Sequence, residues 1–136
     1  MKEKYFLDQI WELHFDIKKP CIVFLYWDLW AGKTTLSKHI LKNMLGINTD
    51  ITSPTYTYYN KYWNHYHFDL YRIEKYDEFF AIGGEDILEN NTWVILIEWP
   101  DRIEKYWKAD IEIYLKKWTE EDEREIEIIY KSNLLT

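Results

Sequence analysis

The sequence has 136 residues, 47% of them hydrophobic, which is enough for one domain with one core, and no apolar run approaches the ~18 residues of a membrane-spanning helix. Its formal net charge of −7 argues against a basic protein that tracks a nucleic-acid groove. Because the charged N-terminal segment is unlike a signal peptide and the single cysteine, Cys21, begins an apolar run, we expect a soluble cytoplasmic protein with a buried, reduced thiol.

The first part of the chain predicts a helix, a strand and a second helix. Apolar residues recur at helical spacing over 4–15, which predicts a short helix. The continuous apolar run Cys21–Tyr26 predicts a strand that is buried on both faces. A loop at 27–32 follows, and Lys33–Leu45 carries its apolar residues on one helical face, with Gly46 placed to end that helix.

The rest of the chain predicts mainly strands. The segment 51–62, rich in Thr and Tyr, is expected to be a loop that leads into an edge strand, with 65–72 as its hairpin partner. A short helix over Glu74–Ala81 is broken by Gly83-Gly84. Three further strands are expected, the first wholly apolar and the others alternating: Trp93–Glu98, Asp110–Lys117 and Arg124–Lys131.

This order of elements predicts a single α/β domain over residues 1–136, with a mixed, partly parallel sheet flanked by helices and an antiparallel hairpin. In such sheets, ligands bind beyond the carboxyl ends of the strands. Three places in the sequence lie just past the expected strand ends, namely the 27–35 loop, Asp69 and Glu98. Binding chemistry is therefore expected at these three places.

The segment Trp27–Thr34 matches the phosphate-loop pattern G-x-x-x-x-G-K-[ST] at seven of its eight positions, the first being the exception. It follows a buried strand and opens a helix, as the pattern requires. Successive backbone N–H groups and the helix dipole would cradle phosphates, while Lys33 would bridge the outer phosphates and the Thr34 hydroxyl would hold Mg²⁺. An ordinary strand–helix turn with an exposed lysine is the alternative, which the GKTT motif disfavours.

Several polar residues near the expected strand ends have both a functional and a structural interpretation. Glu98, at the end of WVILIE, could bind Mg²⁺ directly or through water, or could be a solvated acid. Asp69, in HFDLYR, could serve Mg²⁺ or a water molecule, or could pair with Arg72. Thr55 and Thr57, in SPTYT, could close over the γ-phosphate or could simply favour an edge strand.

Two kinds of ring in the same region are also ambiguous. Trp99 could stack near a nucleotide or pack in the core. His65 and His67 alternate on one strand face, and no cysteine or third clustered ligand supports a metal site there. We therefore predict no histidine-based metal site in this strand.

Five segments together resemble the TsaE family in order and spacing: DLWAGKTT, SPTYT, YHFDLYR, the Glu85-Asp86 pair and IEWP. TsaE proteins are small P-loop ATPases of the bacterial machinery that makes threonylcarbamoyladenosine in tRNA. The resemblance runs from about residue 5 to about residue 115 and implies a P-loop NTPase-like fold. YHFDLYR and IEWP make the resemblance specific, because the phosphate loop alone is shared with many ATPases.

The resemblance implies Mg-dependent ATP hydrolysis that is slow alone and stimulated by partners. Those partners would be the TsaB and TsaD proteins, which ATP turnover would reset between modification cycles, without direct sequence-specific binding of nucleic acid and without a membrane. The implied catalytic residues are Lys33, Asp69 and Glu98, and the implied Mg²⁺ ligands are Thr34 and Glu98. The implied nucleotide-binding residues are Trp30, Ala31, Gly32, Lys33, Thr34, Thr35 and Asp101.

Tryptophan stands at four positions where the family pattern or the turn chemistry has glycine: Trp11, Trp27, Trp30 and Trp63. The chain has 8 tryptophans and only 4 glycines, about 3% glycine against a usual ~7%. Loop glycines adopt positive φ or let the backbone approach the phosphates, so two indoles would crowd a pyrophosphate. We hypothesise that the gene uses UGA as a glycine codon, which the printed sequence translates as tryptophan; Trp93, Trp107 and Trp118 are weaker candidates.

Two other functions remain open from the sequence. A small P-loop kinase would normally carry a lid with arginines, and this chain has only Arg72, Arg102 and Arg124. A decayed site is the other possibility: if Trp27 and Trp30 are genuine, a non-catalytic module that binds a partner becomes a strong alternative.

Overall fold

The computed structural model describes residues 2–6, 17–27, 33–52, 54, 57–117 and 124–131, and for 2–6, 33–35, 117 and 124 it describes the backbone alone. The strands are β1 (Lys2–Phe6), β2 (Cys21–Trp27), β3 (Tyr59–Tyr62), β4 (His65–Asp69), β5 (Val94–Glu98), β6 (Ile111–Lys117) and β7 (Arg124–Tyr130). The helices are α1 (Lys33–Lys38), its π-helical continuation η2 (His39–Met44), α2 (Tyr76–Ala81), α3 (Gly84–Glu89) and the 3₁₀ turn η3 (Pro100–Arg102).

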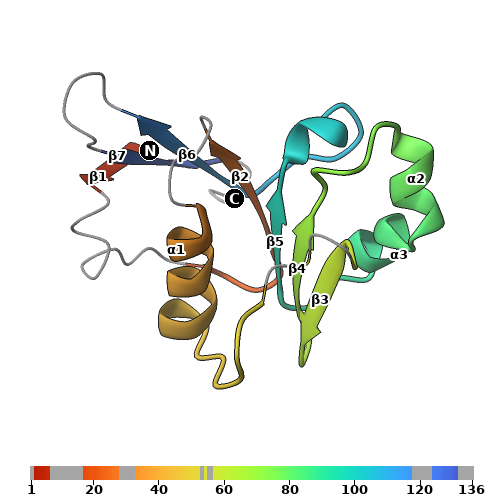
Figure 1. Ribbon diagram of the computed structural model, residues 1–136, viewed down its shortest axis with the longest axis horizontal. Helices are drawn as coiled ribbons and strands as arrows, with labels where there is room; N and C mark the ends of the chain where they lie inside the picture. The colour runs from red at the N-terminus through yellow and green to blue at the C-terminus, as the bar shows by residue number, and fades with distance from the viewer. Residues whose placement is uncertain are drawn as a thin grey trace.

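The described strands form one seven-stranded sheet in the order β1-β7-β6-β2-β5-β4-β3 (Figure 1). The neighbours β6, β2, β5 and β4 are parallel. Beyond β6 the sheet continues with antiparallel β7 and β1, and at the other edge β3 pairs with β4 as an antiparallel hairpin. The mixed α/β sheet with an antiparallel hairpin that the sequence predicts is therefore confirmed.

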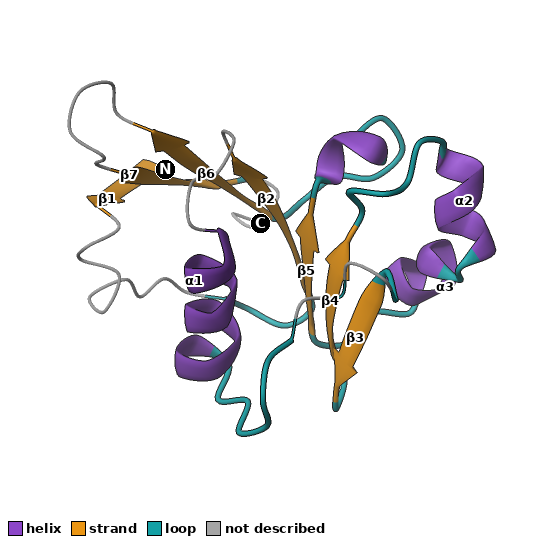
Figure 2. Ribbon diagram, viewed as in Figure 1, coloured by secondary structure: helices purple, strands orange, loops and turns teal. Residues whose placement is uncertain are grey.

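The sheet separates two apolar clusters, because alternate residues of its central strands point to opposite faces. Val23 and Leu25 of β2 pack with residues of α1 and η2 on one face. Phe24, between them, packs on the other face with residues of α2, α3 and the segment that follows η3. Figure 2 shows the helices α2 and α3 apart from α1, across the strands. No helix in the described ranges has the length and apolar character needed to cross a membrane.

Two local expectations are confirmed beside this core. Cys21 is free and buried, and burial, followed by the charge of Asp110, raises the pKa of its thiol to about 12. Gly46 lies just past the end of η2, where the helix stops, and has a φ of +72°, in the left-handed region that favours glycine.

Two predicted elements differ from the structure. The helix over 4–15 is wrong at its start, because β1 occupies Lys2–Phe6 and pairs antiparallel with β7; residues 7–15 of that prediction lie outside the described residues. The helix α3 was not expected, since Gly83-Gly84 reads as a break. Gly83 has a φ of +85° and precedes α3, and a Cβ on Gly84 would lie 2.4 Å from a ring carbon of Phe79. The two glycines therefore permit a tight helix–helix junction.

The β3–β4 hairpin places a tryptophan where the backbone favours glycine. Tyr62 and His65 are paired across the turn, so its loop is Trp63-Asn64. Trp63 has a φ of +56° and is 57% exposed, and positive φ is confined to this first loop residue. This pattern fits a type II′ turn, whose first central residue is usually glycine. The structure thus gives position 63 a conformational reason to be glycine.

Replacing Trp63 by glycine is expected to stabilise the protein by about 1 kcal/mol. A non-glycine residue in this region costs on the order of 1–3 kcal/mol, which outweighs the ~0.5–1 kcal/mol of extra chain entropy that glycine loses on folding. Thermal and urea unfolding of the two proteins would measure the difference. An unchanged or lowered stability of Trp63→Gly would contradict the assignment.

Two of the weaker glycine candidates, Trp93 and Trp107, make specific side-chain contacts, and Trp93 supplies a control. Trp107 donates its indole N–H to the Tyr76 hydroxyl at 2.8 Å. The ring of Trp93 lies 4.6 Å from the ring of His65, and the Lys19 ammonium lies 4.1 Å from its centroid. In the same unfolding experiment, we expect Trp93→Gly to destabilise the protein by about 2 kcal/mol, because it removes partly buried ring contacts.

Candidate functional site

The carboxyl ends of β2, β5 and β4 lie next to one another at one end of the parallel strands, which we call the carboxylate edge. β2 ends at Trp27 and α1 begins at Lys33, so the described backbone puts a strand end and a helix start on either side of the phosphate-loop motif. Of the predicted nucleotide-binding residues, Trp30, Ala31 and Gly32 lie outside the described residues, and Lys33, Thr34 and Thr35 form the first turn of α1.

Two buried carboxylates stand at this edge. Asp69 ends β4 and Glu98 ends β5, and the two residues are direct partners in the parallel register. They are only 2% and 5% exposed, so Glu98 is not a solvated strand-end acid. The Asp69 Oδ1 accepts a hydrogen bond of 3.0 Å from the Tyr71 N–H, and its own N–H donates to the Tyr58 carbonyl at 2.9 Å.

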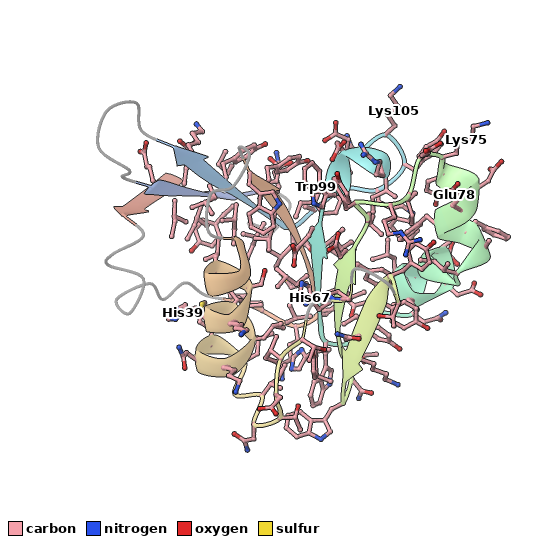
Figure 3. The ribbon with its side chains drawn as sticks, in the orientation of Figure 1. His39, His67, Lys75, Glu78, Trp99 and Lys105 are labelled. Atoms are coloured by element: carbon pink, nitrogen blue, oxygen red, sulfur yellow. The ribbon has the colours of Figure 1, made fainter. Side chains whose placement is uncertain are left out.

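Glu98 is held by side chains from two other elements. The Ser37 hydroxyl of α1 lies 3.2 Å from Glu98 Oε2, and His67 Nε2 of β4 contacts the same oxygen. Figure 3 labels His67 in the middle of the molecule. Ser37 and His67 are each 2% exposed. Sequence reasoning missed both, although the period of two in a strand puts His67 on the same face as Asp69. Similarly, Ser37 follows Thr34 by three residues, which places both on one side of a helix.

The backbone beside the two carboxylates adopts an unusual conformation. Tyr58 and Trp99 have φ values of +69° and +60°, and neither is glycine. Such residues cost on the order of 1–3 kcal/mol each and concentrate at functional sites. Trp99 directly follows Glu98, and its ring packs 5.1 Å from that of Tyr71 and against the core, in line with the packing interpretation of this residue.

The remaining sequence candidates lie around this edge. Asp101, on η3, is paired with Arg102 at 2.5 Å, and its side chain is 44% exposed. The Thr57 hydroxyl donates to the Tyr59 carbonyl at 3.3 Å, at the start of β3. Thr55 lies outside the described residues.

Trp27 fits its surroundings poorly. Its backbone is extended strand, so positive φ gives no reason for glycine at this position. Its ring packs against the α1-side core, but its indole N–H is buried and has no hydrogen-bond partner within the described ranges. A buried, unpaired donor lowers the stability of the folded protein by about 1–3 kcal/mol. The argument for glycine at position 27 therefore rests on the size of the side chain and not on φ. Trp11 and Trp118, like Trp30, lie outside the described residues.

The donor set at this edge fits Mg²⁺. Carboxylate and hydroxyl oxygens are hard ligands of the kind that Mg²⁺ prefers. Among the described residues, no group of three or more His, Cys, Asp or Glu side chains is arranged to hold a metal ion by itself. Mg²⁺ does not require one, since it usually binds to one or two carboxylates and fills its octahedron with phosphate and water oxygens.

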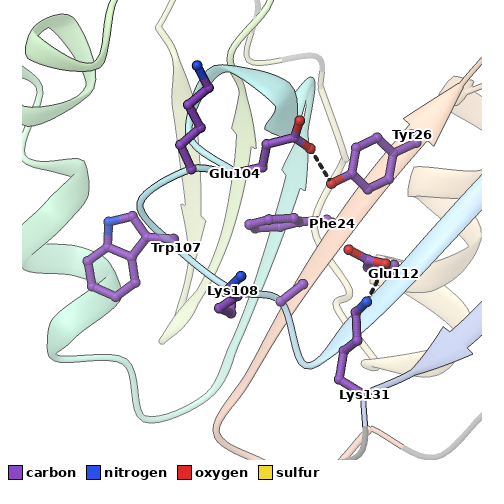
Figure 4. A pocket seen from close by; sticks show the side chains of 9 residues that line it. Phe24, Tyr26, Glu104, Trp107, Lys108, Glu112 and Lys131 are labelled. Atoms are coloured by element: carbon purple, nitrogen blue, oxygen red, sulfur yellow. Dashed lines mark hydrogen bonds and ion pairs between the residues drawn. The ribbon is translucent and has the colours of Figure 1, made fainter.

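A separate hollow of about 620 Å³ lies on the sheet face opposite α1 (Figure 4). Four of its polar side chains form two pairs: the Tyr26 hydroxyl donates to Glu104 at 2.8 Å, and Lys131 pairs with Glu112 at 2.8 Å. Burial, followed by the hydrogen bond to Glu104, raises the pKa of Tyr26, so this hydroxyl stays protonated. The Tyr26–Glu104 bond holds the segment after η3 against β2, and the Lys131–Glu112 pair joins the residue after β7 to β6.

Comparisons with known proteins agree with this geometry. The family model described as threonylcarbamoyl adenosine biosynthesis protein TsaE matches residues 4–126, which is more of the chain than the sequence resemblance covered. The structure is similar to the crystal structure of Bacillus subtilis YdiB, with a TM-score of 0.68 and 29% identity over 98% of this chain and 88% of that one.

Curated relatives carry the same family name. The tRNA threonylcarbamoyladenosine biosynthesis protein TsaE of Haemophilus influenzae is 35% identical over 96% of this chain and 82% of its own. The protein of that name from Rickettsia typhi is 41% identical over 65% of this chain and 62% of its own length. The chain therefore spans about three fifths of the Rickettsia protein and most of the Haemophilus one. With its sheet, its carboxylate edge and these matches taken together, the chain belongs to the TsaE family.

Proposed function

We propose that this protein binds and hydrolyses Mg-ATP as an accessory protein of the threonylcarbamoyladenosine modification of tRNA. The observation that carries the proposal is the buried pair Asp69 and Glu98, at the ends of neighbouring parallel strands and beside the helix that the GKTT motif opens. Membership of the TsaE family supports the part in tRNA modification.

The residues at this edge divide the chemistry among them. The backbone of the loop before α1 and the Lys33 ammonium would bind the phosphates. Thr34 and Glu98 would hold Mg²⁺, which when bound would neutralise the charge that develops on the phosphate oxygens. Asp69, whose carboxylate is fixed by the Tyr71 N–H, would orient the attacking water. No covalent intermediate with the protein is needed in this scheme.

We propose further that the protein acts on a partner complex of TsaB and TsaD in the cytoplasm. The net charge of −7 supports a protein partner rather than direct contact with tRNA, because phosphate backbones are bound by basic surfaces. ATP turnover would then reset the partner complex between modification cycles.

Assays of Mg-ATP binding and hydrolysis, with and without the TsaB–TsaD pair, test this function. We expect slow hydrolysis by the protein alone and faster hydrolysis when the pair is added, independent of any small phosphate acceptor. Transfer of phosphate to a small molecule would instead indicate a kinase. Binding to the pair with no dependence on nucleotide would indicate a non-catalytic module, the function that a genuine, bulky Trp27 at the loop favours.

A further inference from the structure

We propose that His67 and Ser37 are positioning residues that fix the Glu98 carboxylate so that one oxygen, Oε1, faces the bound cation. The inference rests on the proposed Mg-ATP site and adds to it the contacts that set the orientation of the Glu98 carboxylate. Neither residue is assigned a role by the motif, because neither lies in the phosphate loop or at a strand end.

The three side chains come from three separate elements and meet in a buried position. Ser37 is on α1, His67 on β4 and Glu98 on β5, and their exposed fractions are 2%, 2% and 5%. Both contacts engage Oε2 of Glu98, and within the described ranges Oε1 makes no hydrogen bond. A carboxylate held at one oxygen by two donors has lost its freedom to rotate. The other oxygen is left for a ligand.

The hydrogen bonds of His67 favour one tautomer. Its Nδ1 is buried and has no hydrogen-bond partner in the described part of the chain, so a proton there would be an unsatisfied buried donor. The proton of the neutral ring therefore belongs on Nε2, where it is donated to Glu98. In this form the histidine acts as a fixed donor to the carboxylate, as residues behind metal ligands commonly do.

Ser37 adds a second constraint through its place in α1. It follows Thr34 by three residues, so both lie on one side of the helix. Its hydroxyl bond to Glu98 ties the helix that carries one proposed Mg²⁺ ligand to the strand that carries the other. The helix and the strand are thus joined before the cation binds, which lowers the cost of ordering them.

The test compares His67→Met, which removes the donor but keeps the volume, with His67→Gln, whose amide can still donate to Glu98. Both are made in a Trp27→Gly, Trp30→Gly background. The readout is the Mg²⁺ concentration that gives half-maximal binding of a fluorescent ATP analogue. We expect His67→Met to raise it about 10–100-fold and His67→Gln to return it to within about threefold. Binding of the analogue in EDTA should not change.

His65 provides a matched control on the same strand. It is also 2% exposed and points to the same face, but it accepts the Val94 N–H at 3.3 Å and does not contact Glu98. We expect His65→Met to lower thermal stability while leaving the Mg²⁺ dependence unchanged. A similar shift in His65→Met and His67→Met would mean a general loss of packing and would overturn the inference.

The other outcomes are also decisive. An unchanged Mg²⁺ dependence in His67→Met overturns the positioning role while the proposed function stands. Absence of Mg²⁺-dependent binding in the background protein overturns the proposed function and this inference with it. If His67→Met does not fold, Ser37→Ala is measured in the same way, and an unchanged Mg²⁺ dependence there overturns the inference.

Discussion

Replacing Trp27 and Trp30 together by glycine is expected to raise the affinity for Mg-ATP on the order of 100-fold. Glycine at these loop positions lets the backbone approach the phosphates, and two indole side chains would take up that space. With about 1.4 kcal/mol of binding free energy lost to each indole, a factor of ten apiece, the combined effect is about two decades. Isothermal titration of both proteins with Mg-ATP measures it.

Trp63→Gly is the control for this comparison. It removes a tryptophan from a glycine-like turn, but that turn precedes β4 and lies at the opposite end of the strand from Asp69. Its nucleotide affinity should equal that of the unsubstituted protein. Equal affinity in the double variant would contradict the prediction, and UGG at codons 27 and 30 would end the glycine-codon hypothesis. A peptide mass across residues 22–33 from the native organism decides the same point.

Glu98→Gln is expected to lower Mg-dependent ATP turnover by about 100-fold or more. Glutamine keeps the shape of the side chain but removes the charge that would hold Mg²⁺. It also presents an amide to the Ser37 hydroxyl and to His67, both of which now contact a carboxylate oxygen. Turnover is measured as phosphate release over a range of Mg²⁺ concentrations, in the loop-glycine background. Binding of ATP in EDTA should be retained.

Glu127→Gln is the matched control for this variant. Glu127 is also a buried glutamate, 8% exposed, and its carboxylate lies 3.4 Å from the Lys116 ammonium. It lies on β7, however, and not at the carboxylate edge. Its substitution should leave turnover within about twofold, because β6 and β2 separate β7 from the strand that carries Glu98. Comparable turnover in Glu98→Gln and in the loop-glycine protein without this substitution would exclude Glu98 as a ligand of the catalytic cation.

The central strands could be predicted because strands buried on both faces have continuous apolar sequences. Cys21–Tyr26 and Trp93–Glu98 are almost wholly apolar, as strands covered on both faces must be, and the structure places them as adjacent β2 and β5. The edge position of β3 followed from an early proline and its polar composition. The location of Asp69 and Glu98 at one edge then followed from parallel pairing.

What sequence reasoning missed depends on contacts that are distant in the chain. β1 is a strand because Lys2 pairs with Ile129, and no local pattern over 2–15 records that partner. Gly84 was missed for a different reason, because its role depends on how closely the ring of Phe79, on the preceding helix, approaches it. Likewise, His67 looked like a poor metal ligand, and only the fold shows that it contacts Glu98 from a neighbouring strand.

The position of β7 has a consequence for how the molecule is made. The last described strand fills the place between β1 and β6, so the first and sixth strands never touch as neighbours in the sheet. On the ribosome, β1 and the β6 edge of the parallel strands must both wait, with backbone groups unpaired, until β7 has emerged. Nascent chains stalled before residue 124 would therefore expose these unpaired edges to chaperones and to each other.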